Sequence, residues 1–319
     1  MRPMLKVRTH VGDTPLVEVE GILAKLECAN PCGSIKDRIG KYILEESRRR
    51  GLLAPGQGIV EATSGNTGIA FAWFARQMGH PVTIVMPEDM TEERKQIIRS
   101  LGANLVLCSK EGSFSEAAVI RDRLAAENGW FNPDQFSNEL NSECHERTTG
   151  EEILQQTTGR RLGAFVAGIG TGGTIVGVAR RLRRDFPDLH VAAVEPTESA
   201  VMSGGPAGSH GISGIGDGFI PALAGDGDGG VHPYIDEVIT ISTDEAIEAA
   251  LHIQRQHGHC VGISSGANFL AARRLAARFG TVVTIFPDGY TKYKSRGLVH
   301  CEPGRCPHEH ALVVQILEE

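Results

Sequence analysis

Apolar residues follow two alternating patterns along the chain. Short runs rich in β-branched residues predict buried strands, and longer stretches with apolar residues three or four positions apart predict amphipathic helices. The expected strands are 16–19, 22–27, 58–62, 82–86, 104–108, 164–169, 190–195, 238–241 and 281–286, and the expected helices are 39–50, 67–78, 91–101, 115–128, 174–186, 244–257 and 267–279. This alternation predicts an α/β fold with mainly parallel, twisted sheets flanked by helices.

The predicted strands fall into two groups along the chain. Those near 58, 82 and 104 form one group and those near 164, 190, 238 and 281 a second, with a break near 130–150. We therefore expect a smaller, mobile N-terminal domain, 1–140, and a larger C-terminal domain, 141–319. The opening strands could cross from the first domain to the second. Segment 197–233 is too long for an ordinary connection and is interpreted as a functional loop.

Composition narrows the classes of function. The 319 residues include 32 Lys and Arg against 39 Asp and Glu, a formal charge of −7 that provides no basic field for nucleic acid. No apolar run is long enough for a membrane span, and the first ten residues lack a signal-peptide core. The seven cysteines do not form a disulfide-scaffold pattern. We expect a cytoplasmic protein that binds neither nucleic acid nor membranes.

A lysine opens one predicted helix, in the segment Asn30-Pro31-Cys32-Gly33-Ser34-Ile35-Lys36-Asp37-Arg38. The positive end of the helix dipole disfavours the charged form of Lys36 and so favours a nucleophilic amine. The same local pattern also fits the alternative that Lys36 is an ordinary solvated lysine at the start of a helix. Cys32 is interpreted as a small buried spacer rather than a redox group, because free cysteine commonly behaves as a small apolar residue.

Three further motifs join a strand or turn to a helix. Residues 62–68, ATSGNTG, offer N–H groups, hydroxyls and an amide, which suit a carboxylate. Residues 168–174, GIGTGGT, match G-x-G-x-x-G, and Glu195 ends the next strand, so they indicate either an NAD-dependent oxidoreductase or a phosphate cradle. In residues 262–266, GISSG, Ser264 could cap a helix or face a ring nitrogen.

The order and spacing of these motifs resemble the fold-type II family of pyridoxal 5′-phosphate (PLP) enzymes, and most closely its cysteine synthase (O-acetylserine sulfhydrylase) branch. The resemblance also covers 12–17, 86–88, 135–138, 145–153 and 205–221. It implies a tryptophan synthase β-subunit-like fold, PLP as cofactor and a homodimer. It further implies β-replacement on an O-activated L-serine, with O-acetylserine favoured, through an aminoacrylate intermediate, with sulfide as nucleophile and L-cysteine as product.

The resemblance also assigns roles to individual residues. Lys36 would carry PLP and act as the catalytic base, Asn66 would bond the ring hydroxyl, and Ser264 would face the pyridine nitrogen. The cofactor-binding residues would be Lys36, Asn66, Gly170, Thr171, Gly172, Gly173, Thr174 and Ser264, and the substrate-binding residues Thr63, Ser64, Asn66, Thr67, Gln135 and Asp217. The NAD-dependent oxidoreductase then becomes a remote alternative, with Glu195 as the end of a core strand.

Two acids depart from the family pattern. Asp217 stands where cysteine synthases typically carry alanine, and Asp288 lies in a turn that is usually rich in serine. A carboxylate at Asp217 would repel O-phosphoserine and attract a nucleophile that carries an ammonium group. The alternative activity is therefore a cystathionine β-synthase-like or amine-adding β-replacement. Asp217 could equally cap a turn between its two glycines.

Partners and metals complete the expectations. In related enzymes a serine acetyltransferase docks its C-terminus in the active site, which makes that protein a candidate partner. The cluster Cys301, Cys306, His308 and His310 does not have the spacing of a standard structural zinc site. No metal is predicted, since the implied chemistry needs none.

Overall fold

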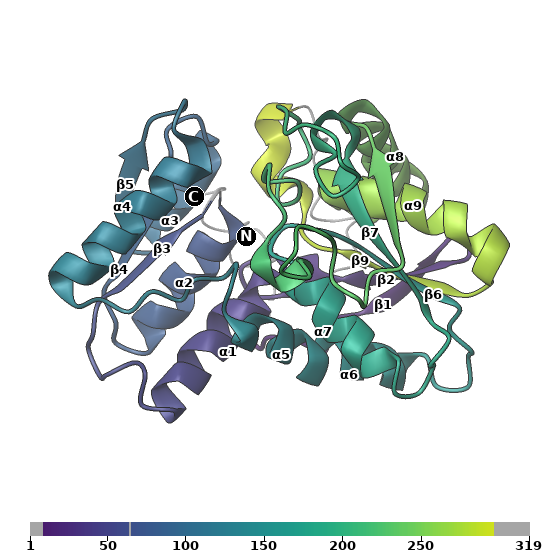
Figure 1. Cartoon of the computed structure of the whole chain (residues 1–319), viewed down its shortest axis with the longest axis horizontal. Coiled ribbons are helices and arrows are strands. Elements are labelled where there is room, and N and C mark those ends of the chain that lie inside the picture. The colour runs from purple at the N-terminus through teal and green to yellow at the C-terminus, as the bar shows by residue number, and fades with distance from the viewer. Residues whose placement is uncertain (1–8, 64, 297–319) are drawn as a thin grey trace, which may run out of the picture.

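The computed structural model describes residues 9–63 and 65–296, which form two sheets flanked by helices (Figure 1). The strands are β1 Leu16–Val19, β2 Ile22–Leu26, β3 Ile59–Ala62, β4 Val82–Pro87, β5 Asn104–Cys108, β6 Ala164–Gly168, β7 His190–Pro196, β8 Glu237–Ile241 and β9 Val282–Phe286. The α-helices are α1 Lys36–Arg49, α2 Asn66–Gln77, α3 Glu92–Ser100, α4 Ser113–Asn128, α5 Glu139–Arg147, α6 Thr149–Gln156, α7 Gly173–Leu182, α8 Thr243–His257 and α9 Ile263–Phe279. Short 3₁₀ turns occur at η1 Glu27–Ala29, η2 Thr197–Ser199, η3 Ala222–Ala224 and η4 Tyr290–Arg296.

The sheets confirm the predicted α/β class. The larger has six strands in the order β1-β2-β9-β6-β7-β8, and the smaller has three in the order β3-β4-β5. All neighbouring strands are parallel except β1 and β2, which form an antiparallel hairpin. The opening strands thus cross to the larger sheet, as the sequence allowed. The domain boundary near residue 140 stays a prediction.

Helices α5 and α6 occupy the segment where the sequence predicted only a break. α5 packs against α1 on one side and α7 on the other, so it joins the part of the chain around the smaller sheet to the part around the larger one (Figure 1). Its buried face includes Asn141, Ser142 and His145. Because these buried residues are polar, the segment lacks the apolar periodicity that reveals a helix in sequence.

A buried charge network fixes the first turn of α1. The Arg38 guanidinium donates to both carboxylate oxygens of Glu27, at 2.7 and 2.8 Å, and to those of Glu152 at 2.7 and 2.8 Å. Lys25 adds a second cation 2.6 Å from Glu152. Removing one partner of such a network leaves an uncompensated buried charge, so the network holds α1 firmly beside α6. None of the described helices is long and apolar enough to cross a bilayer.

Candidate active site

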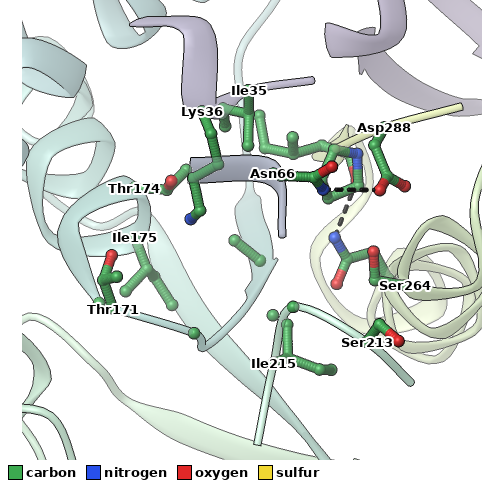
Figure 2. Close-up of a pocket in the computed structure, with 18 residues that line it drawn as sticks. Ile35, Lys36, Asn66, Thr171, Thr174, Ile175, Ser213, Ile215, Ser264 and Asp288 are labelled. Carbon is green, nitrogen blue, oxygen red and sulfur yellow. Dashed lines mark hydrogen bonds between the residues drawn. The ribbon is translucent and has the colours of Figure 1, made fainter. Parts of the chain in front are cut away.

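The loops that follow β3, β6 and β9 meet at one cavity (Figure 2). The helices α1, α2, α7 and α9 begin beside it, and the space between its walls is about 550 Å³, part of it open to solvent. The unsatisfied N–H groups of a helix start suit an anion. Predicted site residues in the wall are Lys36, Asn66, Gly170, Thr171, Gly172, Thr174 and Ser264. Tertiary structure therefore brings four distant sequence motifs to one place.

The glycine positions of the turn after β6 have no room for side chains. A Cβ on Gly170 would lie 2.4 Å from the carbonyl oxygen of Gly214, and one on Gly172 would lie 2.6 Å from the Cβ of Ala224. Gly172 also has a φ of 87°, in the left-handed region that favours glycine. The N-cap residue Gly172 has no side chain that could cap the start of α7. Apart from the N–H of Gly173, which approaches Thr171 Oγ1, the first N–H groups of the helix thus remain available to an anion such as a phosphate.

Helix α5 supports this turn from behind. Asn141 Nδ2 donates to Thr171 Oγ1 at 2.9 Å, and the N–H of Gly173 approaches the same oxygen at 3.4 Å. Since the Thr171 oxygen already accepts two hydrogen bonds, its proton is left for the cavity. Asn141 was not among the site residues predicted from the sequence.

His145, one turn further along α5, holds the second threonine of the turn. Its Nε2 lies 3.2 Å from Thr174 Oγ1, and its Nδ1 lies 2.9 Å from Thr149 Oγ1. Burial, reinforced by the positive charges of Arg38 and Lys36, holds the pKa of His145 well below its usual range. The neutral ring donates through one nitrogen and accepts through the other. This role of His145 was not predicted from the sequence, although 145–153 belongs to the segments that resemble the family.

Lys36 stands at the start of α1 and points its amine into the cavity (Figure 2). Burial lowers the pKa of Lys36, while the negative charges of Asp217 and Asp288 act in the opposite direction. A lowered pKa raises the fraction of free amine, which is the nucleophilic form. The side chain therefore has the environment that carbonyl chemistry requires.

Asn66 is held in the cavity wall by Asp288, which follows strand β9 of the larger sheet. Asn66 Nδ2 donates to Asp288 Oδ2 at 2.8 Å (Figure 2). The Tyr293 hydroxyl donates to the same oxygen at 2.7 Å. Asn66 Oδ1 and Asp288 Oδ1 are buried and have no protein partner in the described part of the chain. Buried polar atoms of this kind are normally paired, so these two atoms indicate that a polar ligand belongs in the cavity.

A second pocket opens beside the first and shares Lys36 and Asn66 with it. It adds the predicted substrate-binding residues Thr63, Thr67, Gln135 and Asp217, together with Arg94, Phe114 and Phe136. Thr67 donates to Gln135 Oε1 at 2.7 Å, which fixes the start of α2. Ser64 lies outside the described residues.

Arg94 is a cation of this pocket that the sequence analysis missed. It is only 3% exposed, and its guanidinium lies 5.3 Å from the centre of the Tyr293 ring. Its buried Nε has no partner among the residues described. A guanidinium with a free N–H matches a carboxylate. Its position after β4, beside the carboxyl end of a parallel strand, was the available signal.

Asp217 lines the same pocket instead of standing free in solvent. Burial raises the pKa of Asp217, and the charges of Lys36 and His210 oppose that shift. Cys32, by contrast, is 1% exposed, and burial raises the pKa of its thiol well above the usual range. The Cys301, Cys306, His308 and His310 cluster lies outside the described residues.

The glycine-rich turn does not have the features of a dinucleotide site. Glu195 ends β7, but its carboxylate already accepts from the backbone N–H groups of Met202 at 2.8 Å and Ser203 at 2.9 Å. The turn instead lines a cavity with Lys36, whose pKa is lowered, and with the buried, unpartnered oxygens Asn66 Oδ1 and Asp288 Oδ1. Fold and site together define an enzyme that holds a phosphate-bearing carbonyl cofactor beside an amine.

Comparison with known proteins identifies that cofactor. The chain belongs to the family of pyridoxal-phosphate dependent enzymes, whose family model matches residues 7–288. A cysteine synthase of Staphylococcus aureus is 39% identical over 308 residues, which cover 93% of this chain and 97% of the relative. The predictions of a PLP enzyme and of the fold-type II architecture are thereby confirmed.

Two solved structures show the same architecture. A hydrogen sulfide-producing enzyme from Fusobacterium nucleatum is 39% identical with a TM-score of 0.85, over 91% of this chain and 90% of that one. An O-acetylserine dependent cystathionine β-synthase from Helicobacter pylori is 37% identical with a TM-score of 0.85, over 91% and 97%.

Proposed function

We propose that this enzyme replaces the β-substituent of an O-activated L-serine, preferentially O-acetylserine, with sulfide to form L-cysteine. The observation that carries the proposal is the continuity of the two pockets: Lys36 and Asn66 line both the phosphate cradle and the carboxylate pocket. Bound PLP supplies an electron sink for negative charge that develops at the substrate Cα. The remaining chemistry falls to side chains of this chain.

Each side chain has a separate task in this proposal. The Lys36 amine holds the cofactor and, once the substrate amine displaces it, takes the Cα proton as general base. Asn66 orients the cofactor ring through its free amide oxygen or its second N–H. The phosphate is bound by the hydroxyls of Thr171 and Thr174 and by the turn at Gly170, Gly172 and Gly173. Ser264, as a neutral group at the ring nitrogen, does not stabilise positive charge there as a carboxylate would, which favours prompt loss of the β-substituent.

The substrate carboxylate occupies the second pocket in this proposal. Thr63, Asn66, Thr67 and Gln135 line this pocket at the N-terminus of α2, whose N–H groups suit an anion. The family resemblance adds Ser64 to the substrate-binding residues. Among the described residues that line that pocket, Arg94 and Lys36 carry the positive charge. Substrate binding then draws the smaller sheet towards the larger one and excludes water.

Replacing Arg94 by Gln is expected to raise the KM for O-acetylserine about tenfold or more, with a smaller change in kcat, because a charged hydrogen bond to the carboxylate is lost. Steady-state kinetics of the PLP-loaded enzyme measure both constants. Arg99→Gln, at the end of the same helix α3, is the matched control. A kcat loss with an unchanged KM would contradict the assignment.

A donor-by-nucleophile screen tests the proposed reaction. O-acetylserine and O-phosphoserine are each offered with sulfide, thiosulfate, homocysteine and amines, and the amino-acid products are quantified. Cysteine from O-acetylserine and sulfide is the expected main product. Failure to convert any activated serine would overturn the proposal.

One observation favours a second candidate activity. The Asp217 carboxylate lines the pocket into which the nucleophile must come, and it would attract an ammonium group such as that of homocysteine. The similar Helicobacter pylori enzyme is an O-acetylserine dependent cystathionine β-synthase. A cystathionine-forming activity is therefore the alternative, and a larger yield with homocysteine than with sulfide would favour it.

Asp217→Ala is expected to raise the kcat/KM ratio of O-phosphoserine over O-acetylserine about tenfold, because a carboxylate repels a phosphate dianion by about 1 kcal/mol or more at close range. Competition between the two donors measures the ratio. Asp228→Ala, on the exposed part of the same long loop, provides the control. An unchanged ratio would show that Asp217 does not determine donor choice.

The assembly and location belong to the same proposal. We place the enzyme in the cytoplasm as a homodimer, and a serine acetyltransferase C-terminus as a candidate occupant of its carboxylate pocket. A C-terminal carboxylate would use the same N–H groups at the start of α2 that suit the substrate. The family resemblance supports the homodimer and the acetyltransferase, and the lack of a disulfide-scaffold pattern among the seven cysteines supports the cytoplasm.

A further inference from the structure

Glu20 stands at the corner of the hairpin that joins β1 to β2. Val19 pairs with Ile22, so Glu20 and Gly21 form a two-residue turn, and their φ values of 49° and 80° are both positive. Such turns favour Asn and Gly, because a side chain is strained in the left-handed region. The turn projects the Glu20 carboxylate to the end of α8, a helix more than 200 residues away in the chain.

Two histidines of α8 converge on one oxygen of this carboxylate. His252 Nε2 lies 2.6 Å and His257 Nε2 lies 3.4 Å from Glu20 Oε1. The three atoms lie within 4.8 Å of one another. All three side chains are partly open to solvent, with exposures of 34% for Glu20, 41% for His252 and 28% for His257, so an ion can enter from the surface.

We propose that Glu20, His252 and His257 form a binding site for a divalent transition-metal ion of the zinc type. Zinc prefers imidazole nitrogens and carboxylate oxygens at about 2.0–2.2 Å, which places neighbouring ligand atoms about 3.3–3.6 Å apart in tetrahedral geometry. The Glu20 to His257 distance already has this value, and the Glu20 to His252 distance reaches it by a small rotation of either side chain. Water completes the coordination.

The charges around the site are mixed but compatible with a cation. Arg273 Nη1 lies 3.7 Å from Glu20 Oε2, the oxygen that faces away from the closer histidine contacts, and so it orients the carboxylate without occupying Oε1. His257 ends α8, where the helix dipole is negative. Glu248, one turn before His252, lines the same surface groove and adds negative charge.

The site lies away from the cofactor cavity and shares no lining residue with it. A bound ion would cross-link the β1–β2 turn, at one edge of the six-stranded sheet, to the end of α8. Its expected effect is therefore on stability, with Tm raised by the ion and the rate of cysteine formation unchanged, since a ligand that binds only the folded state stabilises it by mass action.

Zinc titration of the metal-stripped, PLP-loaded enzyme tests the proposal by calorimetry. The background variant carries Cys301→Ser, Cys306→Ser, His308→Gln and His310→Gln. These substitutions remove four other side chains that could bind zinc. We expect one zinc ion per chain in this background, and a loss of affinity of tenfold or more in Glu20→Gln and in His252→Gln. Glu18→Gln, on the neighbouring strand, is the matched control and should leave the affinity unchanged.

Two results would overturn the metal site. One is the absence of zinc binding in the background variant, and the other is zinc binding that Glu20→Gln and His252→Gln leave unaltered. Cobalt(II) gives a second measurement, because its visible spectrum reports nitrogen and oxygen ligands directly. The Glu20→Gln substitution keeps the size of the side chain, and thermal unfolding without metal shows that the variant is folded.

Discussion

Lys36→Ala should remove the visible absorbance of the bound cofactor and lower the rate of cysteine formation by more than about 10³-fold. The amine of Lys36 points into the cavity with a pKa that burial lowers, and the described lining of that cavity contains no other lysine. No other lysine of the described lining can therefore replace it as cofactor anchor. Absorbance spectra and turnover of the purified variant measure the two effects.

Lys41→Ala is the matched control for this experiment, because Lys41 lies on the same helix with its side chain 45% exposed. It should keep both the absorbance and the activity. Partial recovery of Lys36→Ala by a small added amine would show that the missing group is the amine itself and not the helix. A variant without Lys36 that keeps the visible band and full turnover would contradict the assignment.

Asn141→Asp should weaken PLP binding about 100-fold. The substitution keeps the shape of the side chain but replaces the donor that Thr171 requires with an acceptor, so the Thr171 proton turns away from the phosphate. It also places a negative charge behind the anion cradle. The space is too tight for relaxation, since a Cβ on Gly173 would already lie 2.0 Å from Asn141 Oδ1.

Equilibrium dialysis gives the dissociation constant, and the phosphorus NMR signal of bound PLP reports the cradle independently of activity. Glu139→Gln, an exposed position at the start of the same helix, should change neither. His145→Gln should weaken binding less, because an amide can still donate to Thr174. If Asn141→Asp does not fold, Thr171→Val tests the same hydrogen bond from its other side. Unchanged PLP affinity in both variants would refute the role of α5.

Several strands and the motifs between them were predictable because their signals are local. The runs at 82–86 and 190–195 match β4 and β7 closely, since a buried parallel strand is a mainly apolar segment. The run at 104–108 matches β5, although that strand lies at the edge of the smaller sheet and is only partly buried. The family resemblance rested on four short motifs, each of which shows its glycines, hydroxyls or lysine directly in the chain. α5 was missed because three of the five residues that it buries are polar, and two of these, Asn141 and His145, contact the threonines of the glycine-rich turn.

The roles of single polar groups depended on contacts between distant segments. In sequence, Asp288 was only a departure from the family pattern, and the fold places it against Asn66, 222 residues away. Asp217 had two open interpretations until the pocket was known. The contacts of Arg94, His145 and Glu20 were not predicted, although Arg94 follows a predicted strand and His145 lies in a segment that resembles the family.

The sequence by itself determined the alternation of strands and helices, the position of the glycine turns and the lysine that begins α1, because each depends on neighbours within a few residues. Only the tertiary structure decided that β1 and β2 join the larger sheet, that α5 supports the glycine-rich turn and that Asp217 lines the same pocket as Lys36. Hydrogen bonds and charge interactions act over a few ångströms in space. Which residues lie that close is set by how the two sheets and their helices pack, and no local pattern records it.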